Sequence, residues 1–341
     1  MTRALTAAGE SHTIAVMRVL VTGGTGFLGS HLIDRLLENP ETEIYALIRN
    51  PNRARRLEGR KRIRFLEGSL LDLPQLPAGL SAVYHLAGVT KARKSSDYYT
   101  VNRDGTANLF RSLAQADGSP RVVHVSSLAA AGPSVPGRPG REDDPPRPVS
   151  PYGRSKLAAE AEALVWKDRF PLVILRVAAV YGHGDEDFLQ YFRWIKLGIL
   201  PLYGRGRKSL SLCAAGDAVQ AMRLAAARAD VPSGEIFNIA HAQPARWEEL
   251  GGLAARLLGR RVVRARFPAW GVFLASAACG GIGRLRGRPA ALNLSKCRDM
   301  RPDAWEADVR KAREVLGFEA QTSLEDGLRE TLDWYVRNGL L

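Results

Sequence analysis

The stretch VTGGTGFLGSHL, residues 21–32, places three glycines three residues apart, at Gly23, Gly26 and Gly29. It follows an apolar run that ends at Val21 and precedes residues with helical spacing that begin at Leu32. Glycine allows a sharp turn and a close approach to a ligand, and the amides at a helix N-terminus attract phosphate. A strand, a glycine turn and a helix in this order predict a dinucleotide-binding turn. A glycine-rich turn without a ligand is the alternative.

Apolar, β-branched runs alternate with helical patterns up to about residue 180. This alternation predicts an α/β fold, a Rossmann-type doubly wound parallel sheet covered by helices on both faces. We expect a loose extension over 1–16, an NAD(P)-binding domain over 17–182, and a smaller substrate-binding lobe over 183–341 that is interleaved with the last strands. The expected strands are Arg18–Val21, Glu43–Ile48, Ile63–Leu66, Ala82–Leu86, Val122–Val125 and Leu172–Leu175, and the expected helices are Phe27–Leu37, Tyr98–Ala114, Tyr152–Trp166 and Gln321–Arg337.

The composition is that of an ordinary globular protein, with 45% hydrophobic and 25% charged residues among 341. The net charge is +14, but the basic residues are scattered and form no arm or aromatic-interleaved stripe, so we expect no nucleic-acid partner. Cys213, Cys279 and Cys297 lie far apart and predict neither a disulfide framework nor a metal site. They suit a cytoplasmic protein with reduced thiols.

One uncharged stretch, residues 267–283, is flanked by arginines and interrupted by glycines. It is short for a helix that spans a membrane, which needs about 20 apolar residues. We expect a helix of the core or of the substrate pocket there, and contact with a membrane surface is the alternative.

The end of the second expected strand indicates which dinucleotide binds. Arg49 lies about twenty residues after Gly29, where an acidic residue binds the ribose of NAD. With Arg53 it suits the extra phosphate of NADP, because guanidinium groups donate paired hydrogen bonds to phosphate. We therefore favour NADP. NAD stays open if both arginines are merely surface residues.

The stretch SPYGRSK, residues 150–156, sets Tyr152 and Lys156 four residues apart, on one face of a helix. A phenol with a pKa of about 10 is a poor acid or base at neutral pH. A nearby ammonium and a cationic nicotinamide would stabilise its phenolate, which suits proton transfer at a carbonyl or carbinol oxygen. Such a pair also occurs on surface helices. A hydroxyl upstream, at Ser126 or Ser127, makes the pattern specific.

The ordered motifs resemble the extended short-chain dehydrogenase/reductase family, which includes the NAD(P)-dependent epimerases and dehydratases. The resemblance runs from Met17 to the C-terminus. The matching motifs are TGGTGFLG (22–29), HLAG (85–88), VNxxGT (101–106), SS (126–127), YxxxK (152–156), LR (175–176), VYG (180–182), DA (217–218), DxxKAxxxLG (308–317) and WY (334–335).

The resemblance implies that Tyr152 moves the proton and that Lys156 holds the nicotinamide ribose and keeps Tyr152 acidic. It makes Ser127 the residue that hydrogen-bonds the reacting oxygen, rather than Ser126, because Ser127 lies five residues before Gly132 as the family's serine does. The catalytic residues are thus Ser127, Tyr152 and Lys156. The residues expected to bind the cofactor are Gly23, Gly26, Phe27, Leu28, Gly29, Arg49, Arg53, Leu70, Leu86, Ala87, Gly88, Asn102, Tyr152 and Lys156.

Two positions indicate the branch of the family. Sugar-nucleotide enzymes usually carry an Asn and an Arg where this chain has Ala179 and Leu210. An apolar pocket suits a lipid-like or polycyclic substrate. The resemblance therefore favours the hydroxysteroid dehydrogenase and dihydroflavonol reductase branch, with a secondary alcohol and a ketone interconverted on a hydrophobic small molecule.

Alternatives stay open. The basic run over 204–208 suits a diphosphate and keeps a nucleotide-sugar epimerase or dehydratase as the second candidate. A non-enzymatic role is a third alternative. Relatives that only sense redox state or bind partners typically lose the Tyr or the Lys, and the presence of both here disfavours that role. The resemblance also implies a homodimer paired through two long helices.

Overall fold

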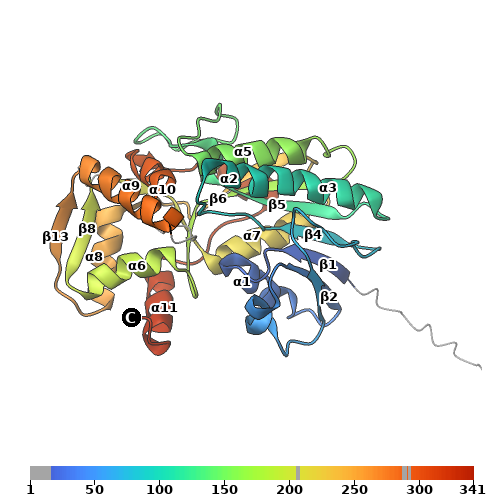
Figure 1. The fold of residues 1–341 in the computed structure, drawn as a ribbon, viewed down its shortest axis with the longest axis horizontal. Helices are drawn as coiled ribbons and strands as arrows, with labels where there is room; N and C mark the ends of the chain where they lie inside the picture. The colour runs from blue at the N-terminus through green and yellow to red at the C-terminus, as the bar shows by residue number, and fades with distance from the viewer. Residues whose placement is uncertain (1–16, 205–207, 286–289, 291–292) are drawn as a thin grey trace, which may run out of the picture.

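The computed structural model describes residues 17–204, 208–285, 290 and 293–341, and the predicted extension over 1–16 lies outside them. Its centre is a seven-stranded parallel sheet in the order β11-β6-β5-β4-β1-β2-β3 (Figure 1). The α/β prediction is confirmed, and the six expected strands lie within two residues of their predicted bounds. The sheet strands are β1 (Met17–Thr22), β2 (Thr42–Ile48), β3 (Ile63–Glu67), β4 (Ala82–His85), β5 (Arg121–Ser127), β6 (Leu172–Val177) and β11 (Glu235–Ile239).

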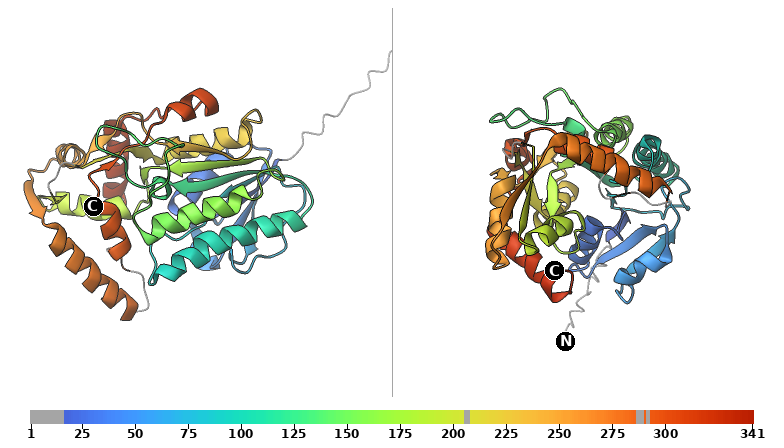
Figure 2. Two further views of the ribbon diagram at one scale, coloured as in Figure 1. Left: turned by 90° about the horizontal axis from the view of Figure 1, so that it is seen from above. Right: turned by 60° about the vertical axis from the view of Figure 1, so that its left-hand side comes forward.

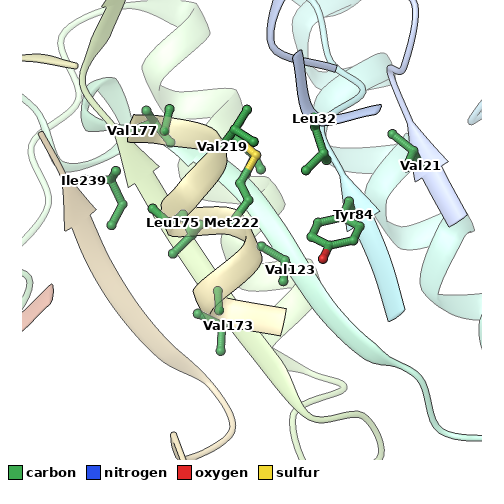
Figure 3. Close-up of a cluster of buried hydrophobic side chains, with 14 of the residues drawn as sticks. Val21, Leu32, Tyr84, Val123, Val173, Leu175, Val177, Val219, Met222 and Ile239 are labelled. Carbon is green, nitrogen blue, oxygen red and sulfur yellow. The ribbon is translucent and has the colours of Figure 1, made fainter. Parts of the chain in front are cut away.

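Helices cover both faces of this sheet, and Figure 2 shows α3 and α5 on one side and α7 on the other. Successive residues of a strand point to opposite faces. Val19 and Val21 therefore belong to the core beneath α1 and α7, whereas Leu20 joins the core beneath α3 and α5. Figure 3 shows part of the first core, where Val219 and Met222 of α7 pack over the sheet. The covering helices are α1 (Phe27–Leu36), α3 (Gly105–Gln115), α5 (Pro151–Leu164) and α7 (Ala215–Ala227).

The helix expected over Tyr98–Ala114 is built differently. It begins earlier as α2 (Ser95–Tyr99), passes through a π-helical turn, η2 (Thr100–Asp104), and continues as α3. At the junction of the π-turn and α3, the side chain of Leu70 fills the space that a Cβ would need at Gly105. Such π-turns frequently mark functional sites, and this one contains Asn102.

The smaller lobe has its own core, which gathers aromatic and aliphatic side chains such as Phe192, Leu250 and Tyr335. Because β11 follows residue 182 and yet completes the main sheet, the second half of the chain is interleaved with that sheet. The division at 182 itself stays a prediction. The helices of the lobe are α6 (Asp187–Lys196), α8 (Trp247–Leu257), α9 (Ala269–Leu285), α10 (Leu294–Met300) and α11 (Leu324–Arg337).

Short strands complete this half of the molecule, in the pairs β8–β13 and β7–β10 and the triplet β12-β9-β14. Their bounds are β7 (Ala179–Tyr181), β8 (Ile199–Tyr203), β9 (Ser209–Leu210), β10 (Leu212–Ala214), β12 (Ala245–Arg246), β13 (Val263–Phe267) and β14 (Ala304–Trp305). The remaining elements are η1 (Pro51–Leu57), α4 (Leu128–Ala131) and η3 (Ala312–Leu316).

The uncharged stretch 267–283 forms the end of β13 and most of α9. The expectation of a core helix is wrong, since its large side chains are exposed; Trp270 is one of them. No helix within the described parts of the chain has the length and apolarity that crossing a membrane requires.

Candidate active site

The glycine turn after β1 leaves no room for side chains. Gly23 has a φ of +76°, and a Cβ there would lie 2.8 Å from the amide nitrogen of Ala87 and 2.9 Å from the carbonyl carbon of Leu86. A Cβ at Gly29 would overlap the carbonyl oxygen of Gly23. The turn therefore lies directly against the loop that follows β4, which brings two sets of predicted cofactor residues together.

The N-terminus of α1 is open to an anion. Gly26 is the N-cap, and no side chain caps the helix. The first amides of a helix, here those of Phe27 and Leu28, have no intrahelical acceptor and carry partial positive charge. This arrangement fits the pyrophosphate of a dinucleotide.

The residues predicted to meet the adenosine include two arginines that follow β2. Arg49 follows the last residue of this strand and is exposed. Arg53 belongs to η1, and its side chain lies outside the described part of the chain. Leu70, expected against the adenine, is buried next to Gly105, and its carbonyl accepts a hydrogen bond of 3.2 Å from Asn108. Leu70 thus joins the adenine-side loop to the start of α3.

Asn102 fixes the loop after β4 rather than leaving its amide unbound. Its Oδ1 accepts from the amide of Val89 at 2.8 Å, and its Nδ2 donates to the carbonyl of Val89 at 3.2 Å. The same Nδ2 donates to Ser155 Oγ at 2.9 Å. A Cβ at Gly88 would lie 2.9 Å from Asn102 Oδ1. Asn102 is therefore a positioning residue that ties the cofactor loop to α5.

His85 orders the hydrogen bonds behind this loop. Thr106 donates to the carbonyl of Asn102 at 2.6 Å, so its Oγ1 accepts from His85 Nε2 at 2.8 Å. His85 Nδ1 then accepts from Thr22 Oγ1 at 2.8 Å, and this hydroxyl accepts from the amide of Ala87 at 3.2 Å. Burial, aided by Lys156, lowers the pKa of His85 to about 3. The ring is neutral, and its tautomer is set by the network.

The three predicted catalytic residues come from two neighbouring elements. Ser127 ends β5 and caps α4, where its Oγ accepts from Ala129 at 3.2 Å. Ser150 caps α5 by accepting from Gly153 at 2.9 Å. This cap sets Tyr152 in the first turn of α5 and Lys156 one turn later, so both lie on the side of the helix that meets β5.

Lys156 extends from α5 toward β5, and its Nζ donates to the carbonyl of Val125 at 2.7 Å. Burial lowers the pKa of its ammonium to about 8, an effect that Glu160 opposes. Burial also raises the pKa of Tyr152 to about 12, although a hydrogen bond with Ser127 lowers it. The phenol is therefore protonated at neutral pH in the protein alone, and its acidification by Lys156 together with a bound nicotinamide stays a prediction.

The two adjacent serines have different partners. Ser126 is buried and donates to Glu160 Oε1 at 2.5 Å, and Glu160 forms a buried ion pair of 2.8 Å with Arg176. Ser127 points to the other face of the strand, is half-buried, and meets Tyr152. The alternation along β5 thus separates a structural serine from the one near the phenol.

Charged groups surround Tyr152 on its outer side. The ring of Tyr98 lies 6.1 Å from that of Tyr152. Asp187 of α6 forms ion pairs with Lys91 at 2.6 Å and with Lys296 of α10 at 3.1 Å. The two ion pairs of Asp187 could not be predicted from the sequence, because each joins segments about 100 residues apart that only the folded chain brings together.

Asp299 is a further carboxylate near the phenol. Burial raises its pKa to about 6, against hydrogen bonding from Ser150 and the charge of Lys296. Its own charge contributes to the raised pKa of Tyr152. Asp299 and Asp187 thus place two carboxylates near the phenol, and the apolar substrate pocket stays a prediction.

A cavity of about 490 Å³ opens beside the start of α5, and two arginines are among its lining residues. The lining residues are Val149, Arg298, Arg301, Pro302 and Asp303. The basic run over 204–208, which the sequence offers either as a diphosphate contact or as a solvated surface loop, lies partly outside the described residues, at 205–207. Among the residues that the structure describes, no cluster of His, Cys, Asp or Glu could hold a metal ion.

Comparison with known proteins identifies the family. The NAD dependent epimerase/dehydratase family matches residues 19–240. The chain is similar to a ceramide reductase of Caulobacter vibrioides, with 29% identity over 95% of this chain and 96% of that protein. It is also similar to a 4-hydroxy-2-methyl-3-oxo-4-farnesyl-3,4-dihydroquinoline-1-oxide ketoreductase of Stigmatella aurantiaca, with 28% identity over 92% and 91% of the two chains.

Among solved structures, MoeE5 in complex with UDP-glucuronic acid and NAD is similar to this chain, with a TM-score of 0.75 and 30% identity over 94% of this chain and 99% of that one. Full-length likeness, the glycine turn and the parallel sheet all agree. The chain belongs to the NAD dependent epimerase/dehydratase family.

Proposed function

We propose that this protein is an NADP-linked reductase that converts a ketone to a secondary alcohol on a hydrophobic, lipid-like substrate. The observation that carries the proposal is the pairing of a neutral Tyr152 phenol with Ser127 above the buried ammonium of Lys156. A neutral phenol is the form that donates a proton to a carbonyl oxygen. This group suits proton transfer at a carbonyl or carbinol oxygen, and the choice of a ketone as substrate follows the reductases among the relatives.

The proposed step moves one proton through the side chains of the site. The ketone oxygen accepts hydrogen bonds from Ser127 and Tyr152 and takes the phenolic proton as C=O becomes C–OH. Lys156 stabilises the phenolate that remains, and solvent then restores its proton. The bound nicotinamide cofactor supplies the hydride for the carbonyl carbon. Gly23, with no room for a Cβ, and the uncapped α1 suit its pyrophosphate, and Arg49 supports the phosphate of NADP.

The substrate class rests on apolar residues and on relatives. Ala179 is exposed at the start of β7, and Leu210 is half-buried in β9. Neither can anchor a diphosphate. The likeness to a ceramide reductase and to a ketoreductase with a farnesyl-bearing substrate supports a lipid-like ketone.

A nucleotide-sugar epimerase or dehydratase is the second candidate. The cavity lined by Arg298, Arg301 and Asp303 favours it, because arginines in a cavity lining suit a diphosphate. The likeness to MoeE5 supports it as well.

Cofactor stoichiometry separates the two functions. The purified protein is incubated with NADPH and long-chain lipid ketones, or with UDP-glucose, and both cofactor and products are measured. A reductase consumes one NADPH for each alcohol formed. Conversion of UDP-glucose to another UDP-sugar without net NADPH loss, and no lipid alcohol, would overturn the proposal in favour of the second candidate.

A further inference from the structure

Helix α9 turns its largest apolar side chains toward solvent. Trp270 is 70% exposed, Phe273 52%, Leu274 58% and Ile282 49%. With Ala278 between them, these positions follow helical spacing and form one apolar stripe. A helix that covers a globular core carries its apolar stripe on the inner side, so α9 shows the reverse arrangement.

The inner side of α9 carries only small side chains by contrast. Within its described side chains, over 269–283, only Ser276 is buried, and its hydroxyl donates to the carbonyl of Val272 at 2.7 Å. Figure 1 shows α9 at the outer edge of the smaller lobe, beside α10 and near β13. No described part of the chain covers the apolar stripe formed by Trp270, Phe273, Leu274, Ala278 and Ile282.

The chain around this stripe is strongly basic. Between Glu249 and Asp299 the sequence has ten lysines and arginines and no acidic residue, within a chain whose net charge is +14. Arg264, on β13, pairs with Glu248 at 2.9 Å and remains 66% exposed. Arginines stand at both ends of the uncharged run, at 264, 266, 284, 286 and 288.

We propose that α9 docks this protein on the surface of an anionic phospholipid membrane, lying in the interface without crossing it. Trp270 and its apolar neighbours would enter the acyl boundary, where tryptophan is favoured. Basic side chains of the acid-free segment, such as the exposed Arg264, would meet the lipid phosphates, because long basic side chains extend to headgroup level. This inference goes beyond the proposed reaction and does not depend on it.

Charge favours a membrane over a second copy of the chain. A symmetric contact through α9 brings two acid-free, basic segments together, and like charges repel across an interface. An anionic lipid surface complements both the apolar stripe and the basic flanks. Neutral lipid alone would complement only the stripe.

The test uses the full-length protein and vesicle co-sedimentation, which needs no substrate. We compare phosphatidylcholine vesicles with and without phosphatidylglycerol, at low and high salt. The wild type is expected to bind the anionic vesicles about tenfold more tightly than the neutral ones, and high salt is expected to weaken this binding. A Trp270→Ala/Phe273→Ala/Leu274→Ala variant is expected to lose at least tenfold in affinity.

A matched control is Val165→Ala, which truncates an apolar side chain that is 76% exposed at the end of α5 and should bind as the wild type does. Circular dichroism checks that each variant is folded. The inference is overturned if the wild type ignores anionic vesicles or if the triple variant binds them unchanged. It is also overturned if the triple substitution abolishes a dimer in solution while no vesicle binding is seen, because a second copy would then cover α9. Failure here leaves the proposed reductase untouched, since lipid ketone turnover is measured separately.

Discussion

Helices α5 and α9 distribute their side chains in opposite ways. α5 buries Ser155, Lys156 and Glu160, three polar residues, whereas α9 exposes Trp270 and Phe273. Soluble proteins usually do the reverse of both, since charged groups are seldom fully buried and large apolar patches are seldom exposed.

The two helices differ in whether the rest of the protein supplies partners for these unusual side chains. Every buried polar group of α5 has a partner within the protein: Ser155 accepts from Asn102, Lys156 donates to Val125, and Glu160 pairs with Arg176. The stripe on α9 has no cover within the described chain. A departure that is satisfied internally points to catalysis, and one left unsatisfied points to something outside the protein.

The variant Tyr152→Phe tests the proposed catalytic role of α5 and should have the largest effect. Loss of the proton donor is expected to lower turnover of a lipid ketone about 10³-fold and to leave NADPH binding intact. Steady-state kinetics and nicotinamide fluorescence measure the two effects. Tyr98→Phe removes a hydroxyl from the neighbouring ring, 6.1 Å away, and should keep most of the activity. Turnover near the wild-type level in Tyr152→Phe would refute the assigned role.

Glu160→Gln tests whether the buried polar groups of α5 depend on one another. The Arg176 guanidinium is 4% exposed and loses its counter-charge in this variant. A buried charge without a partner is costly, so we expect the free energy of unfolding in urea to fall by about 3 kcal/mol. Glu38→Gln breaks the exposed pair with Arg35 and should cost less than about 1 kcal/mol. Equal stability of the two variants would contradict the interpretation.

The variant Arg49→Asp tests whether Arg49 sets the preference for NADPH over NADH. Replacing an exposed cation with an anion should weaken NADPH binding at least about tenfold, because the carboxylate repels the ribose phosphate. NADH binding should stay the same or improve. Fluorescence titration gives both affinities. Arg246→Asp makes the same charge change in the smaller lobe and serves as the control. If NADPH and NADH bind the wild type equally, Arg49 has no role in the choice.

His124 tests the rule that buried polar groups need partners. Neither of its ring nitrogens has a hydrogen-bond partner in the described chain, and its ring lies 5.0 Å from that of His85. Burial, with the charges of Lys156 and His85, holds its pKa well below the usual value of 6.5. The unfolded chain therefore binds a proton below about pH 6.5 that the folded chain refuses, so this group lowers stability as the pH falls.

His124→Leu removes this group with little change in volume. We expect the free energy of unfolding at pH 7 to rise by about 1 kcal/mol, because an unpaired buried polar group is lost. Between pH 6.5 and 5, the decline of stability should be shallower than in the wild type by up to about 1.4 kcal/mol per pH unit. Urea unfolding at several pH values measures both. Parallel pH profiles for the two proteins would show that His124 is charged or partnered in the fold.

Much of the N-terminal half, which carries the predicted cofactor residues, could be predicted from short stretches of the sequence. The six strands, the glycine turn and the helix over 152–166 were predictable, because apolar runs and glycine spacing act over a few residues. The π-turn around Asn102 was not, since the apolar pattern there looks like that of an ordinary α-helix. The role of His85 was equally hidden. His85 lies in the HLAG motif, but its hydrogen-bond partners Thr22 and Thr106 lie 63 and 21 residues away in the sequence.

The sequence by itself determined the family, the parallel sheet, and the residue types available for proton transfer, because these are written in motifs of short range. Only the tertiary structure decided the environment of those residues. Burial raises the pKa of Tyr152, and the fold brings Lys91 and Lys296 to Asp187. It also decided that α9 faces outward, since an apolar run looks the same whether a core or solvent meets it. Burial and charge pairing are sums over segments distant in the chain, and no local pattern contains them.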